Sequence, residues 1–216
     1  LTDNDFPLKV LGGVHLRNHI VQHEPLFLTQ KYRADLKMDV ARRRPQGLEI
    51  DFRTQVKKSD SGSLVWESLT TFLFRKKFKD QDSESALSGI LSNLSDGKAL
   101  SSFSVPANTG KRFGMLTKDI NPIHMSKMLA RLFGFKRDIC HGMWAVGRSL
   151  GAIQNVDYDK PVRNDVSFKG PMHMEDDITI KVSAADPFRF ELYSGKNERP
   201  CVVGCNRNVS SGENLA

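Results

Sequence analysis

Cysteine is scarce in this sequence, and long hydrophobic runs are missing. Among 216 residues there are three cysteines, Cys140, Cys201 and Cys205, which are too few and odd in number for a disulfide framework. Cys201 and Cys205 form one C-x3-C pair, with no second pair to complete a zinc site. No apolar run approaches the roughly 20 residues of a membrane span. We therefore expect neither disulfides, nor a metal site, nor a membrane span.

The first residues also lack the features of a secretion signal. The segment Leu1–Asp5 is polar and acidic and does not begin with Met. These features predict a cytoplasmic protein, present here as a fragment or a processed form.

The composition is that of a folded globular protein. Hydrophobic residues make up 39% and charged residues 26%, which excludes a disordered chain. The formal net charge of +7 favours anionic partners such as nucleic acid, acidic lipid or phosphorylated small molecules. The basic residues are scattered, without an aromatic-flanked basic platform, so a nucleic-acid partner is not expected.

The first part of the chain, to about residue 80, has the pattern of an antiparallel meander. Leu48, Ile50 and Phe52 alternate with charged residues, residues 57–62 form a turn signal, and a second strand follows over Leu64–Phe74. Residues 83–104, of which eight are serine, predict a linker. The predicted domains are residues 1–82, a linker over 83–107, and residues 108–216.

The last part has helices followed by strands. Asn121-Pro122 is a helix start, and an apolar stripe follows up to Gly134. A second helix is predicted from Gly142 to about Ile153, and four alternating segments follow Pro161. The predicted class is α+β. Both parts end in a meander, which is a weak indication of two copies of one unit. The residues of the predicted stripe are Met125, Met128, Leu129, Leu132 and Phe133.

Asp119 and His124 bracket the start of the first predicted helix. The helix dipole would favour an ionised Asp119 and a neutral His124, a suitable pair for holding and deprotonating one water. The alternative is that Asp119 helps Asn121 to cap the helix, with no role for His124. Spacing alone favours that alternative slightly.

Gly142 lies at the start of the second predicted helix, where its backbone N–H could stabilise an oxyanion. Taken alone, a packing glycine between helix and sheet is the better interpretation. Cys140 is interpreted as a small buried residue, although His141 follows it directly.

Three other sequence patterns are weaker candidates for a functional site. His15, His19 and His23 are spaced by four, and we interpret them as solvated strand histidines. The basic run Arg42–Arg44 precedes a turn. Thr109-Gly110-Lys111 lacks the first glycine and the following Ser/Thr of a phosphate loop, so that function is rejected.

The two segments around Asp119 and Gly142 together resemble a known protein family. The run Asp119-Ile120-Asn121-Pro122-Ile123-His124 is separated by sixteen residues from His141-Gly142-Met143, and together they resemble the signature of the MaoC-like dehydratases, or (R)-specific enoyl-CoA hydratases. The resemblance is strong over about residues 108–170. One departure is Lys118, where the family often has a small residue.

The resemblance implies a hotdog fold, in which an antiparallel sheet wraps a helix. It further implies a double hotdog of two such sheets, with residues 1–82 as a degenerate or truncated first copy and 108–216 as the catalytic copy. The implied activity is the reversible hydration of trans-2-enoyl thioesters, or dehydration of (R)-3-hydroxyacyl thioesters, by a hydro-lyase. A non-catalytic acyl-thioester binder and a hotdog thioesterase remain alternatives.

The implied site consists of the catalytic pair Asp119 and His124, loop support from Asn121, and an oxyanion donor in the backbone N–H of Gly142. No metal or redox cofactor is implied. The substrate would be carried by CoA or an acyl carrier protein, whose negative charge suits the basic chain. Both a monomer and a homodimer are compatible with the fold.

Overall fold

A computed structural model describes residues 13–80, 82, 84–86, 93–154 and 156–215. The chain divides into two compact units, each assembled from separate parts of the sequence. Unit 1 comprises residues 1–14, 91–154 and 168–203. Unit 2 comprises residues 15–90, 155–167 and 204–216.

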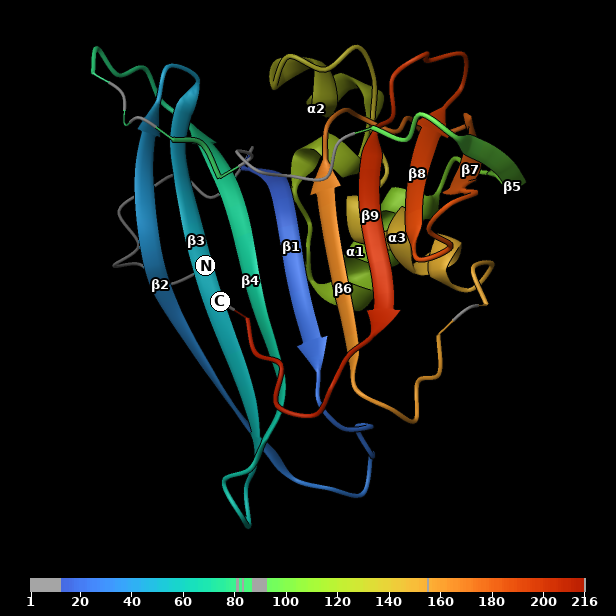
Figure 1. Ribbon diagram of the computed structural model, residues 1–216. Helices are drawn as coiled ribbons and strands as arrows, with labels where there is room; N and C mark the ends of the chain where they lie inside the picture. The colour runs from blue at the N-terminus through green and yellow to red at the C-terminus, as the bar shows by residue number, and fades with distance from the viewer. Residues whose placement is uncertain (1–12, 81, 83, 87–92, 155, 216) are drawn as a thin grey trace. The chain divides into compact units, whose positions relative to one another are not determined.

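Unit 2 is built from long antiparallel strands, as the alternating pattern predicts (Figure 1). Strand β2 pairs with β3, and β3 pairs with β4, and β1 pairs with β6. Strand β3 ends at Lys58 and β4 begins at Leu64, which confirms the predicted turn between them. The strands are β1 (Val14–Gln22), β2 (Tyr32–Arg44), β3 (Gly47–Lys58), β4 (Leu64–Arg75) and β6 (Val162–Phe168). The described residues of unit 2 contain no helix, so a helix of a first hotdog copy is not found among them.

Unit 1 contains the helices. Its strands β5 (Gly97–Ser104), β7 (Asp177–Ser183) and β8 (Arg189–Ser194) pair in the order β5-β7-β8, antiparallel. The last strand, β9 (Val202–Asn208), begins in unit 1 and continues into unit 2. The helices are α1 (Thr109–Thr117), the 3-10 turn η1 (Pro122–His124), α2 (Lys127–Leu132) and α3 (Gly142–Leu150). Four side chains with no exposed surface form the centre of its core: Ile178, Ile180, Phe190 and Leu192.

The helix predicted from residue 121 to 134 is two short elements. Ser126 adopts an extended conformation after η1, and its side chain then caps α2 by accepting from the Leu129 N–H at 3.2 Å. Met128 and Leu132 of the predicted stripe are 71% and 77% exposed. The predicted stripe therefore does not form one core face, because the extended residue Ser126 separates η1 from α2.

Two further segments differ from the sequence pattern. Helix α1 was not predicted. Strand β5 falls inside the Ser-rich segment interpreted as a linker, and most of its residues are exposed. An exposed strand at the sheet edge shows little hydrophobic alternation, which explains why its sequence is indistinguishable from a linker. Helix α3 begins at Gly142 as predicted and ends at Leu150, three residues early.

The combination of antiparallel strands and short helices confirms the α+β class. In the part of the chain that the structure describes, no helix is both long and apolar enough to cross a membrane.

Candidate active site

Helix α1 presents two glycines to the segment that carries Asp119 and His124. A Cβ atom at Gly110 would overlap the carbonyl oxygen of His124, and one at Gly114 would lie 2.6 Å from the carbonyl oxygen of Asp119. The two glycines are four residues apart, so they share one face of the helix. The backbone of this segment therefore packs directly on α1. Sequence reasoning considered Gly110 only as part of a phosphate loop and missed this role.

The Asp119 carboxylate is the exposed member of the group. Its side chain is 53% exposed, and its Oδ1 accepts a hydrogen bond from the Asn121 backbone N–H at 3.2 Å. The side chain of Asn121 donates to the carbonyl of Gly13 at 3.2 Å and makes no cap hydrogen bond to η1. Asn121 thus occupies the N-cap position but ties the loop to another segment of unit 1.

His124 is buried, with only 9% of its surface exposed. Its Nδ1 lies 2.8 Å from the carbonyl of Ile139. Because a carbonyl only accepts, Nδ1 carries the proton and Nε2 keeps its lone pair. Burial, together with the neighbouring His141, lowers the pKa of His124 to about 4. The imidazole is therefore neutral at neutral pH. The predicted helix dipole is not the cause, since η1 is a single three-residue turn.

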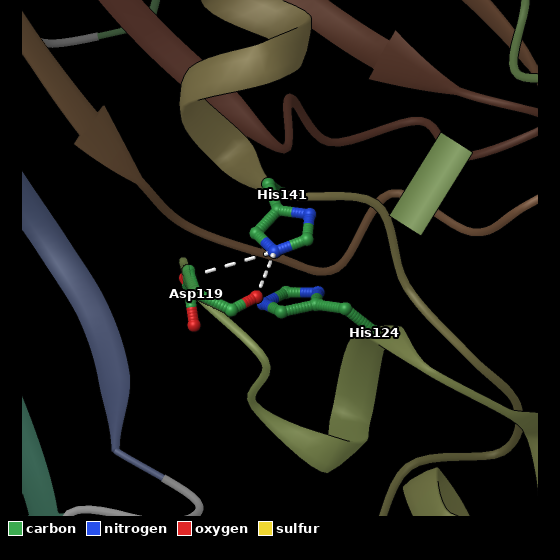
Figure 2. A group of neighbouring side chains, drawn as sticks. All are labelled: Asp119, His124 and His141. Carbon is green, nitrogen blue, oxygen red and sulfur yellow. Dashed lines mark hydrogen bonds and ion pairs between the residues drawn. The ribbon is translucent and has the colours of Figure 1, made fainter. Parts of the chain in front are cut away.

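His141 completes the group, and the sequence analysis did not include it among the site residues. It occupies the N-cap of α3 and is 4% exposed. Its Nε2 donates to the backbone carbonyl of Asp119 at 3.1 Å and lies 3.6 Å from Oδ2 of the same residue. Its ring stacks on that of His124 (Figure 2). The two ring centroids are 3.7 Å apart. The only sequence signal for it was its place in the His141-Gly142-Met143 motif.

The polar atoms of the three side chains are spaced closely enough for one water to bridge two of the groups. One ring nitrogen or carboxylate oxygen from each residue lies within 4.8 Å of the others. A water with hydrogen bonds of about 2.8 Å to two groups spans a separation of about 4.6 Å at a tetrahedral angle. A metal ion bound by Nε2 of His141 would have to displace the hydrogen bond from this nitrogen to the Asp119 carbonyl.

Gly142 is a packing glycine, as the sequence alone favoured, and its role as an oxyanion donor stays a prediction. A Cβ atom there would overlap the ring of Phe168, so it is a packing glycine. Its N–H is also the first of α3 and has no acceptor among the described residues.

The remaining candidates are structural. Burial raises the pKa of Cys140 to about 12, so the thiol stays neutral and is no nucleophile, in agreement with its interpretation as a small buried residue. The three N-terminal histidines are not solvated, contrary to expectation. His15 stacks on Phe72 at 4.8 Å, His19 Nδ1 lies 2.6 Å from Asp165, and His23 Nε2 lies 3.4 Å from Glu67. The strand position was right for His15 and His19 and wrong for His23, which follows the end of β1, and acidic and aromatic neighbours cover these side chains.

The backbone at Lys118 is strained, which explains the small residue often found there in the family that the sequence resembles. Lys118 has φ +62°, in the left-handed region that costs a side-chain-bearing residue about 1 kcal/mol. We expect Lys118→Gly to stay within about 1 kcal/mol of the parent stability, because relief of strain offsets the entropy of glycine. Lys118→Val should lose about 1–2 kcal/mol. Chemical denaturation measures both, and equal stability of the two variants would contradict a left-handed Lys118.

Comparison with known proteins confirms the resemblance. Residues 99–191 match the family model of the MaoC like domain. A 3-hydroxyacyl-thioester dehydratase X from Mycobacterium tuberculosis is 28% identical over 186 residues, which cover 86% of this chain and 65% of that protein. The chain thus spans just under two thirds of the length of this relative.

The solved structures agree. The crystal structure of HtdX from M. tuberculosis has a TM-score of 0.76 and 25% identity, covering 95% of this chain and 80% of that one. A M. tuberculosis protein described as having a double hotdog fold has a TM-score of 0.62 at 11% identity, covering 89% and 74%. Residues 99–191 are therefore a MaoC-like domain, and the chain has the α+β hotdog fold and is homologous to HtdX.

Proposed function

We propose that the chain adds water to trans-2-enoyl thioesters and removes it from (R)-3-hydroxyacyl thioesters, with Asp119 and His124 as the catalytic pair. The observation that carries this proposal is the neutral His124, whose Nδ1 is engaged by the Ile139 carbonyl, with one of its ring nitrogens within 4.8 Å of a carboxylate oxygen of the exposed Asp119. A dehydratase of 3-hydroxyacyl thioesters among the relatives supports the same reaction class.

The chemistry follows from these groups. A thioester makes C3 of the enoyl chain electrophilic and C2 able to accept a proton. Water held between Asp119 and Nε2 of His124 attacks C3 as one of the two groups takes its proton. The C3–O bond forms, the double-bond electrons move toward the carbonyl oxygen, and the pair returns one proton to C2. Dehydration reverses each step.

The Gly142 N–H is the proposed oxyanion donor. Negative charge develops on the thioester oxygen during addition, and an unpaired N–H at a helix start is a suitable partner for it. Asn121 supports the loop, since its N–H contacts Asp119 and its side chain contacts Gly13. Residues 108–216 then carry the catalytic groups, and residues 1–82 form the degenerate half.

The reaction as written consumes only water, so we propose that no metal or redox cofactor takes part. The chain's net charge of +7 suits a phosphate-bearing thioester of CoA or an acidic acyl carrier protein. We also propose a cytoplasmic location and a monomer or homodimer.

Incubation with crotonyl-CoA and longer trans-2-enoyl-CoAs tests the function. We expect the conjugated double bond to disappear without release of free thiol. Release of thiol would identify a thioesterase instead. Tight binding of every acyl-CoA and acyl-carrier-protein ester without turnover would identify a non-catalytic binder.

A further inference from the structure

His141 is a buried polar side chain whose presence needs an explanation beyond packing. Only 4% of it is exposed, and its Nδ1 has no hydrogen-bond partner among the described residues. A buried unpaired ring nitrogen costs about 1–3 kcal/mol. An apolar side chain of the same size would avoid this cost, so the imidazole is not there for stability alone.

The contacts of His141 reach both members of the proposed catalytic pair. Its Nε2–H donates to the backbone carbonyl of Asp119, the same residue whose carbonyl lies against Gly114 of α1. Its ring lies on that of His124 at 3.7 Å and 26°. Phe113 of α1 also packs on His141, with its ring centroid 5.1 Å from that of His141. One side chain thus contacts both the loop before η1 and the ring of His124, the last residue of η1.

We propose that His141 is a positioning residue, which holds the Asp119 loop through its N–H and the His124 ring through stacking, so that both groups face one water. This inference rests on the proposed function for its kinetic consequence, but its structural consequences are measurable without any substrate.

The stack also bears on the charge of His124. Two imidazoles at this distance resist simultaneous protonation. Among the described residues, the titratable groups facing His124 are His141 and Asp119, and the first lowers its pKa while the second raises it. Helix α1 contributes Gly110 and Phe113, and the segment before α3 contributes the Ile139 carbonyl, none of which titrates. Removing His141 should therefore raise the pKa of His124.

NMR of the imidazole rings in the parent protein is the first test. We expect His141 as the Nε2–H tautomer and His124 as the Nδ1–H tautomer. An Nδ1–H tautomer for His141 would overturn the proposal, because Nε2 could not then donate to Asp119.

Two variants separate the contributions. His141→Gln keeps an N–H donor near the place of Nε2 and removes the second imidazole, so the titration of His124 should move to higher pH. His141→Phe keeps a stacked ring and removes the donor, so kcat should fall about tenfold or more with little change in KM. His23→Gln, which removes an imidazole in unit 2, is the matched control and should change neither quantity.

The results that would overturn the positioning role of His141 differ from those that would overturn the proposed hydratase function. An unchanged His124 titration in His141→Gln, together with unchanged kcat in His141→Phe, overturns the positioning role. If the parent protein hydrates no enoyl thioester, the function fails, while the tautomers and the shifted titration still decide the positioning role.

Discussion

Asp119→Asn is expected to lower kcat for enoyl-thioester hydration by about two orders of magnitude or more. The amide keeps the size of the carboxylate and loses its negative charge and one acceptor, so it can no longer share the water with His124. Since the Asp119 side chain is half exposed and contacts the Asn121 N–H, the fold should be unaffected. Steady-state kinetics with a trans-2-enoyl-CoA, alongside a thermal unfolding curve, measure both effects.

His124→Ala should show a loss of the same size, because it removes the Nε2 lone pair. Asp159→Asn, at an exposed aspartate of unit 2, is the matched control and should retain parent kinetics. If Asp119→Asn or His124→Ala keeps turnover near that of the parent, the catalytic assignment is wrong.

Gly110→Ala is expected to have the second large effect. The added methyl group would overlap the His124 carbonyl oxygen and lie 2.6 Å from the Met174 methyl group, so the segment of η1 must move away from α1. Overpacking of this kind costs about 1–3 kcal/mol of stability. A displacement of about 1 Å at His124 would lower kcat by about a hundredfold.

Gly147→Ala in α3 is the control for this variant. No atom lies within 4 Å of the position its Cβ would take, and the residue is exposed. Alanine there should raise the unfolding free energy by about 0.5–1 kcal/mol through helix propensity and leave activity unchanged. Parent-like stability and turnover in Gly110→Ala would contradict the close packing of α1 on the catalytic segment.

The sequence patterns predicted some elements and missed others, and the difference lies in the kind of side chain that each element buries. Strand β3 was predicted because Ile50 and Phe52 are apolar and alternate with charged residues, and both side chains are buried. Helix α1 buries Thr109, Gly110 and Gly114 and exposes Met115 and Leu116. Its contact face is small rather than hydrophobic, so hydrophobic periodicity cannot detect it.

The candidate site was predicted only in part for a similar reason. Asp119 and His124 are close in sequence and belong to a recognisable motif. His141 reaches them through the fold, from the N-cap of α3, and its stacking on His124 depends on how α3 is placed against η1. The cause of the lowered pKa of His124 likewise depends on burial, which no local spacing specifies.

The most direct test of the account is hydration in water enriched in oxygen-18. The claim is that one water, held by Asp119 and His124, attacks C3 of the enoyl chain. It predicts an (R)-3-hydroxyacyl thioester with one labelled oxygen at C3 and no free thiol. A labelled free carboxylic acid with release of thiol would contradict the claim, because the water would then have attacked the thioester carbonyl.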